Sequence, residues 1–103
     1  MAHPTKVAEL KDVSPGQSAC VLFGGDKVAL FNVEGTIHAI ANTCTHRGGP
    51  LSEGEVEGTT VTCPWHGASF DLKTGAVLGP PAGQSVNCYQ VTVKGNDILL
   101  SVQ

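Results

Sequence analysis

The sequence predicts an all-β fold, and three features of the chain carry that prediction. No segment keeps apolar residues at the 3.6-residue period of an amphipathic helix over several turns. Short runs rich in Val, Ile, Leu, Phe and Thr recur instead, as is typical of strands. Turn residues separate these runs, and the 103 residues include 13 Gly and 6 Pro. Together these features favour short antiparallel strands joined by tight turns.

The first part of the chain is predicted to form a meander of four strands. They are expected at residues 6–10, 19–23, 27–33 and 36–41. Gly24-Gly25-Asp26 and Glu34-Gly35 are short connections of the kind that joins hairpin strands. The meander brings the chain to Cys44.

The second part contains small strands, a proline-rich loop and a final hairpin. Strands are expected at residues 55–57, 59–63, 69–72, 86–94 and 98–102. Within 86–94, alternation places Val86 and Cys88 on one face and Tyr89, Val91 and Val93 on the other. The chain, residues 1–103, should form one domain, which at this length buries roughly 65% of its unfolded surface. Residues 1–42 and 84–103 should build a basal antiparallel sandwich or open barrel, with residues from about 43 to 83 inserted as a separate lobe.

The composition excludes several classes of function. Charged residues make up 15% of the chain and the net charge is −3, so nothing favours binding to nucleic acid or to an anionic membrane. No apolar run reaches the roughly 18 residues of a transmembrane helix, and residues 1–10 lack the apolar core of a signal peptide. We therefore expect a cytoplasmic protein. We also expect it to be a monomer.

Two short motifs combine a thiol with an imidazole. They are Cys44-Thr45-His46 and Cys63-Pro64-Trp65-His66, with sixteen residues between His46 and Cys63. Thiolate and imidazole bind zinc, copper or iron–sulfur centres rather than magnesium or calcium. A structural zinc site is therefore one interpretation, although zinc fingers usually pair Cys with Cys and His with His. Mixed pairs favour a two-iron cluster in which one iron takes both thiolates and the other takes both imidazoles.

These two motifs resemble the signature of the Rieske iron–sulfur proteins, C-x-H-x(15–17)-C-x2-H. The length of the chain, its all-β pattern and the loop Gly79-Pro80-Pro81-Ala82-Gly83 are similar to a small soluble Rieske ferredoxin. The resemblance implies a [2Fe–2S] cluster held by Cys44, His46, Cys63 and His66. It also implies residues around the cluster, which we expect at Arg47, Gly48, Pro64, Trp65, Gly67 and Pro80.

The resemblance further implies an electron carrier that is not an enzyme by itself. Such ferredoxins pass electrons from a flavin-dependent NAD(P)H reductase to a terminal oxygenase, often one that dihydroxylates aromatic rings. Three alternatives stay open at this point. They are a small subunit of a larger reductase such as nitrite reductase, the structural zinc module, and a redox-sensing regulator.

Departures from the respiratory Rieske proteins predict a low reduction potential. Those proteins carry a disulfide between the two ligand loops, whereas this chain has Gly49 and Trp65 at the matching positions. They also place hydroxyl donors where this chain has Ala68 and Phe70. Hydrogen bonds to sulfur stabilise the reduced cluster, so their loss lowers the potential, to roughly −150 mV. Ser69 could still donate such a bond from a shifted position.

Four other residues or groups attract attention. Cys20 and Cys88 are expected to be buried free thiols, with a disulfide between them as the less favoured reading. His38 is expected to be a strand residue with a solvated ring. Trp65 should shield the cluster loops or contact a partner. Glu53, Glu55 and Glu57 form a solvated acidic face or steer a basic partner.

Overall fold

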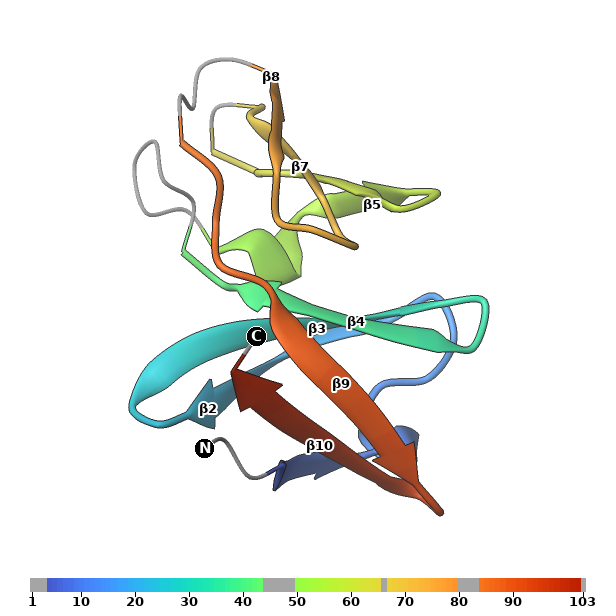
Figure 1. Ribbon diagram of the computed structural model, residues 1–103. Helices are drawn as coiled ribbons and strands as arrows, with labels where there is room; N and C mark the ends of the chain where they lie inside the picture. Colours follow the sequence, from blue (N-terminus) through green and yellow to red (C-terminus); the bar gives the residue numbers. More distant parts are fainter. Residues whose placement is uncertain (1–3, 44–49, 66, 80–83, 103) are drawn as a thin grey trace.

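A computed structural model describes residues 4–43, 50–65, 67–79 and 84–102. Strands make up nearly all of its regular secondary structure, as predicted (Figure 1). The strands are β1 Thr5–Glu9, β2 Ser18–Phe23, β3 Asp26–Val33, β4 Thr36–Ala41, β5 Glu55–Glu57, β6 Thr60–Thr62, β7 Ser69–Asp71, β8 Val77–Gly79, β9 Tyr89–Lys94 and β10 Asp97–Val102. Two short 3₁₀ helices, η1 Leu10–Asp12 and η2 Leu51–Glu53, complete the elements. The described residues contain no helix long and apolar enough to cross a bilayer.

The strands form three antiparallel sheets. The lower sheet has the order β1-β10-β9, the middle sheet β2-β3-β4 and the upper sheet β5-β6-β7-β8. Figure 1 shows the upper sheet standing on the middle one, with β9 and β10 crossing below. An isolated bridge between Ile40 and Cys88, with a 2.8 Å hydrogen bond from the Ala41 N–H to the Asn87 carbonyl, joins the middle and lower sheets.

The middle sheet is covered on both faces, and its central strand shows this most clearly. In β3, Val28 and Leu30 pack into a lower core with Ile98 and Leu100. Ala29 and Phe31 alternate with them and pack into an upper core. Because both faces are covered, Val28 to Phe31 is an unbroken apolar run, as is typical of strands buried on both sides.

Two of the predicted turns are hairpin connections with left-handed backbone. Gly24 and Gly25 have φ of 60° and 88° between β2 and β3. Glu34 and Gly35 have φ of 53° and 94° between β3 and β4, which is the signature of a tight two-residue hairpin turn. Glu34 is the one residue other than glycine with positive φ among those described.

Several expectations are corrected. The first four strands do not form one meander, because β1 pairs with β10 in the lower sheet and only β2, β3 and β4 pair in sequence order. β8 was not predicted, because Val77–Gly79 is too short to show alternation and gains strand geometry only by pairing with β7. β9 begins at Tyr89 rather than at residue 86, and Cys88 takes part only in the isolated bridge. The two 3₁₀ helices were also missed. Other boundaries agree to within one or two residues.

The expected burial of Cys20 is wrong. Cys20 lies in β2, at the edge of the middle sheet, where its side chain is exposed. Cys88 is partly buried against the upper core, and both thiols are free rather than joined in a disulfide. The alternation predicted for Val86 and Cys88 is confirmed, since both contact the upper core while Tyr89 and Val91 contact the lower one.

Candidate metal centre

The two segments that carry the expected ligands, and the proline-rich loop, are flanked by residues of one hydrophobic cluster. Leu51 follows the first segment, Cys63 and Ala68 bracket the second, and Val86 follows the proline-rich loop. All four belong to the upper core, where none is more than 6% exposed. The fold therefore brings the bases of three loops together over the middle sheet.

The structure describes four of the ten expected site residues. These are Cys63, Pro64, Trp65 and Gly67. The other six lie outside the described residues; they are Cys44, His46, Arg47, Gly48, His66 and Pro80. No group of three possible metal ligands lies together within the described ranges, which contain a single member of the expected ligand set.

Cys63 is held firmly at the end of β6. Its N–H donates to the Ala68 carbonyl at 2.7 Å, and its own carbonyl accepts the Gly67 N–H at 3.1 Å. These two bonds join Cys63 to the residues that follow the second ligand segment. Gly67 has φ of 81°, a left-handed conformation that side chains disfavour, although a Cβ there would meet no atom within 4 Å. Glycine is therefore required by the backbone angle rather than by crowding.

The thiol of Cys63 is almost fully buried, at 3% exposure, and forms no disulfide. A buried, preorganised thiol at a turn is what a structural ligand to a soft metal needs. The donor that the structure describes thus fits an iron–sulfur cluster.

Hydroxyl groups do not face the side of β6 and β7 on which Cys63 lies. Ala68 and Phe70 are fully buried in the upper core together with Cys63. Ser69 alternates with them and points to the opposite face, where its Oγ lies 3.4 Å from Thr62 Oγ1. In the described strands the Ser69 hydroxyl therefore lies on the face opposite to the Cys63 side chain.

Two apolar side chains of the upper sheet and its loops remain largely exposed. Trp65 is 57% exposed and Leu78 is 54% exposed. More than half of the Trp65 surface is therefore open to solvent.

His38 is a strand residue as expected, but its side chain is only partly exposed to solvent. It lies half-buried in β4, and the pKa of its imidazole is lowered first by burial and second by the nearby Lys73 ammonium, while Asp71 acts weakly in the opposite direction. Asp71 is the last residue of β7, and Lys73 lies in the turn that follows it. His38 therefore lies where the upper sheet meets the middle one.

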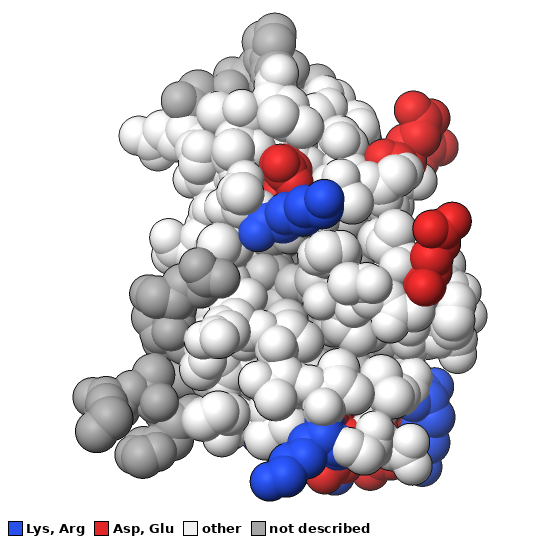
Figure 2. Space-filling view, turned by 45° about the vertical axis from the view of Figure 1, so that its right-hand side comes forward, with Lys and Arg blue, Asp and Glu red and all other residues white. Residues whose placement is uncertain are grey.

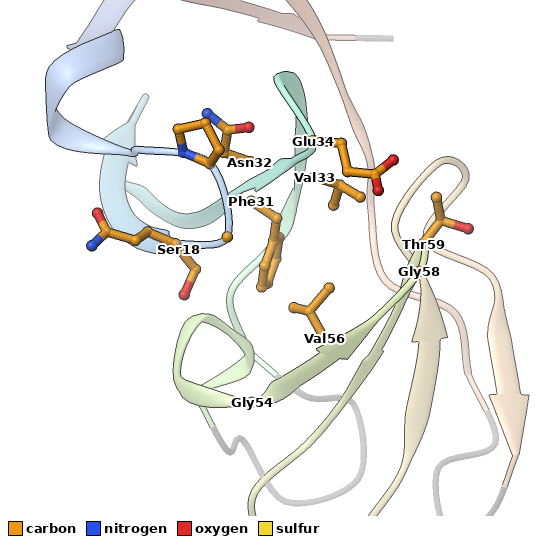
Figure 3. A pocket seen from close by; sticks show the side chains of 12 residues that line it. Ser18, Phe31, Asn32, Val33, Glu34, Gly54, Val56, Gly58 and Thr59 are labelled. Atoms are coloured by element: carbon orange, nitrogen blue, oxygen red, sulfur yellow. The ribbon is translucent and has the colours of Figure 1, made fainter.

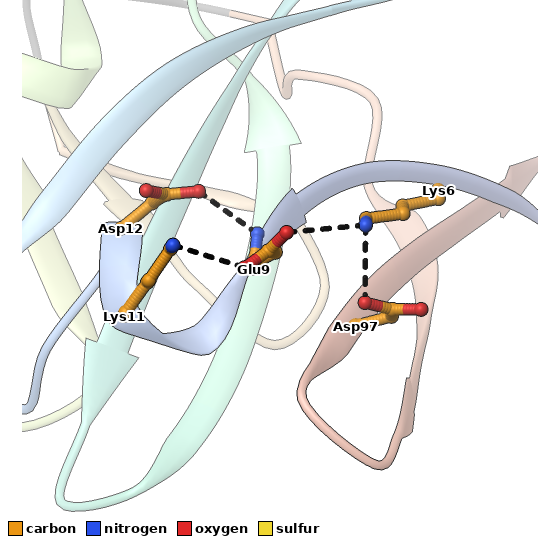
Figure 4. Close-up of polar contacts among 5 residues, drawn as sticks. All are labelled: Lys6, Glu9, Lys11, Asp12 and Asp97. Atoms are coloured by element: carbon orange, nitrogen blue, oxygen red, sulfur yellow. Dashed lines mark hydrogen bonds and ion pairs between the residues drawn. The ribbon is translucent and has the colours of Figure 1, made fainter.

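The charges of the chain are distributed unevenly. In the lower part, Lys6 forms ion pairs with Glu9 at 3.3 Å and Asp97 at 3.2 Å, and Lys11 lies 3.5 Å from Glu9 (Figure 4). The acidic residues Glu34, Glu53, Glu55 and Glu57 form no ion pair with any described residue. Figure 2 shows acidic side chains on one flank of the upper half with no basic side chain beside them.

An open cleft of about 530 Å³ separates this flank from the middle sheet. Figure 3 shows Phe31 and Val33 of β3 on one side and Val56 of β5 on the other. Glu34 stands at one end of the cleft. The cleft lies away from Cys63, which is absent from its lining, so it is separate from the candidate metal centre.

Comparisons with known proteins agree with this architecture. Residues 3–90 of the chain match the Rieske [2Fe-2S] domain family. The chain is 36% identical over 97 residues to the biphenyl dioxygenase ferredoxin subunit of Pseudomonas sp. strain KKS102, covering 93% of this chain and 89% of that one.

Solved structures give the same result. The ferredoxin of carbazole 1,9a-dioxygenase from Nocardioides aromaticivorans IC177 superposes with a TM-score of 0.91 at 31% identity, covering 97% of this chain and 98% of the other. A ferredoxin in a complex of reduced oxygenase and oxidized ferredoxin in carbazole 1,9a-dioxygenase gives 0.87 at 30% identity, covering 95% and 92%. A putative NADH-dependent nitrite reductase small subunit from Mycobacterium tuberculosis gives 0.86 at 27% identity, covering 100% and 97%.

The all-β prediction and the cluster prediction are both confirmed by these matches, and the zinc alternative is not retained. The cofactor is a [2Fe–2S] cluster of the Rieske type. The buried Cys63 thiol, the loop bases gathered in one core and the match over residues 3–90 lead to one conclusion: the chain belongs to the Rieske [2Fe-2S] domain family.

Proposed function

We propose that this protein is a one-electron carrier that takes electrons from a flavin-dependent NAD(P)H ferredoxin reductase and delivers them to a terminal oxygenase acting on aromatic rings. The observation that carries the proposal is the similarity to ferredoxin subunits of dioxygenase systems along most of both chains. The proposal assigns no reaction of its own to the chain and places it in the cytoplasm as a monomer.

In this proposal Cys44 and Cys63 bind one iron, and His46 and His66 bind the other. A cluster with two imidazole ligands supplies one-electron transfer at a higher potential than an all-thiolate cluster. The chain's own contribution is to hold its ligands rigidly and to set the potential. The two backbone bonds of Cys63 and its burial support the first role. The apolar Ala68 and Phe70 beside it support a potential near the low end of the Rieske range.

Contact with both partners is assigned to the end of the molecule that bears the loops. Trp65 and Leu78 are large, exposed apolar side chains there, and residues of this kind anchor protein interfaces. A carrier must release each partner after transfer, so the interface should be small and transient. One of the structural relatives is itself a ferredoxin in complex with an oxygenase.

The ligand assignment is tested by histidine variants of the anaerobically purified protein. His66→Ala and His46→Ala should abolish the visible spectrum of the cluster and the reduced-state EPR signal of low average g. His38→Ala is the matched control, because it removes an imidazole of β4 that we do not assign to the cluster. A full spectrum in His66→Ala would exclude His66 as an essential ligand.

The role as a carrier is tested by reconstitution. The protein should accept one electron per chain from NAD(P)H through a flavin reductase and pass it to a terminal oxygenase, which then hydroxylates an aromatic substrate. Without the carrier, substrate conversion should stop. Conversion at an unchanged rate in its absence would contradict the proposal.

The second candidate function is that of a small subunit of a nitrite reductase. Its support is the structural similarity to such a subunit, with a TM-score of 0.86. This candidate predicts stable association with a large reductase subunit and stimulation of nitrite reduction. Affinity purification at physiological salt separates the two functions, because an oxygenase carrier should elute without a stoichiometric partner.

A further inference from the structure

Residues 42–43 and 50–52 join the segment that contains Cys44 and His46 to the rest of the fold, and we call these residues the neck. Asn42 lies on the first side of the neck. Asn42 follows β4 and is only 7% exposed. Its carbonyl accepts the Leu51 N–H at 2.7 Å, and its Oδ1 accepts the Ser52 N–H at 2.9 Å. Its own N–H donates to the Lys27 carbonyl at 3.0 Å. Asn42 thus connects Leu51 and Ser52, on the other side of the neck, to the hairpin of β2 and β3.

The opposite side of the neck is equally well fixed. Thr43 and Pro50 form an isolated β-bridge, and Leu51 is fully buried in the upper core. The Ser52 carbonyl accepts a hydrogen bond from Ser18 Oγ at 2.5 Å. Ser52 is therefore held through its N–H by Asn42 and through its carbonyl by the first residue of β2.

The carboxamide is the part of this arrangement that depends on residue identity. Any residue at position 42 could make the backbone bonds, but an acceptor of the right length is needed to reach the Ser52 N–H. Groups outside the ligand set that orient the ligands typically change metal affinity by about 10–100-fold when they are mutated. They act by restricting the geometry available to the loop.

We propose that Asn42 is a positioning residue for the iron–sulfur cluster: its carboxamide fixes the distance between the two ends of the first ligand segment. This inference rests on the proposed assignment of Cys44 and His46 as ligands. Asn42 itself touches no metal in this scheme. It acts through Ser52 and the closed neck.

A second buried asparagine supplies a matched control. Asn32, in β3, is 6% exposed. Its Nδ2 donates to the Val13 carbonyl at 2.8 Å, and its Oδ1 accepts the Gly35 N–H at 2.8 Å. The structure describes two carboxamide hydrogen bonds for Asn32 and one for Asn42. Those of Asn32 hold the turn between β3 and β4 and not a ligand segment.

The experiment compares cluster-loaded variants by the rate at which the visible absorption decays in excess iron chelator. Asn42→Ala should lose the cluster about tenfold faster than the wild-type protein or more. Asn32→Ala should lower the melting temperature without changing the rate of cluster loss. Asn42→Asp keeps the Oδ1 acceptor and should restore a rate close to that of the wild type. The reduced-state EPR spectrum should shift only in Asn42→Ala.

Equal rates of cluster loss in Asn42→Ala and Asn32→Ala would overturn the proposal, as would a rate for Asn42→Asp as high as that of Asn42→Ala. If Asn42→Ala does not fold, Ser18→Ala is the second variant, because it removes the hydrogen bond from the exposed Ser18 hydroxyl to the Ser52 carbonyl. Ser18→Ala should also accelerate cluster loss. An unchanged rate of cluster loss in Ser18→Ala would overturn the proposal as well. A wild-type chain that binds no iron would refute the proposed function instead, so the two failures are distinguishable.

Discussion

Replacing Gly75 with alanine should strongly destabilise the protein. Gly75 is buried after β7, has φ of 79°, and donates its N–H to the Asp71 carbonyl at 2.7 Å. Its own carbonyl accepts the Val86 N–H at 2.9 Å. A Cβ at this position would collide with the Val86 carbonyl oxygen and lie 3.1 Å from the carbonyl carbon. Since the colliding atoms belong to the backbone, relief requires the chain around Val86 to move.

The expected magnitude follows from three costs. A left-handed conformation costs an alanine about 1 kcal/mol. Loss of the bond to the buried Val86 amide costs about 1 kcal/mol, and displacement of the Val86 side chain from the upper core adds about 1 kcal/mol. The total of about 3 kcal/mol corresponds to a fall in Tm of more than about 10 °C for a domain of this size.

Two other glycines separate the contributions. Gly95 has φ of 64° but open space around it, so Gly95→Ala should carry only the conformational cost and lower Tm by about 4–8 °C. Gly54 has an ordinary φ of −78°, but a Cβ there would collide with the Thr62 carbonyl oxygen. Gly54→Ala should therefore report the steric cost alone.

The assay is thermal unfolding of the cluster-loaded variants, monitored by circular dichroism at one scan rate. Cluster loss can make the transition irreversible, so the comparison uses Tm values measured under identical conditions. If Gly75→Ala and Gly95→Ala lower Tm equally, contact with Val86 contributes nothing and the reasoning is refuted.

Three further predictions follow from single features. Glu34→Gly should raise Tm by a few degrees, because it relieves a left-handed backbone at a cost of about 1 kcal/mol; an unchanged or lower Tm would contradict this. The lowered pKa of His38 means that the folded state binds its proton less readily than the unfolded state, so its contribution to stability is fully present above about pH 6.5 and is lost as the pH falls below that value. His38→Gln should reduce the fall in Tm over that range, and an identical fall in both proteins would exclude the histidine. Replacing Glu55 and Glu57 with Gln should slow electron transfer to a basic partner at low salt and not at high salt. Asp26→Asn, at the first residue of β3, is the control in these stopped-flow measurements.

Local chemistry predicted much of the fold. The hairpin at Glu34-Gly35 follows from a turn signal between two apolar runs, and β4 occupies the predicted residues 36–41. The motif around Cys63 predicted a ligand at the end of a short strand, and the structure places that thiol there, buried. The complete ligand set stays a prediction, because three of its four members lie outside the described residues.

Other features depend on contacts between residues distant in the sequence. Cys20 was expected inside because free cysteines are usually buried, but its strand lies at the edge of a sheet, which the residue itself does not reveal. The neck held by Asn42 involves residues ten and fifteen positions away, and a single asparagine carries no periodic signal. Such bonds become visible only when the sheets are assembled.

The burial of β3 on both faces has a consequence for local opening. Amide groups of β3 exchange with solvent only when the lower core and the upper core have both come apart, because Val28 and Leu30 belong to one and Ala29 and Phe31 to the other. Deuterium uptake should therefore be slowest in β3 and should follow global unfolding there, whereas β5 at the edge of the upper sheet should exchange by small fluctuations. The same strand makes the iron–sulfur end and the opposite end of the molecule lose their protection together.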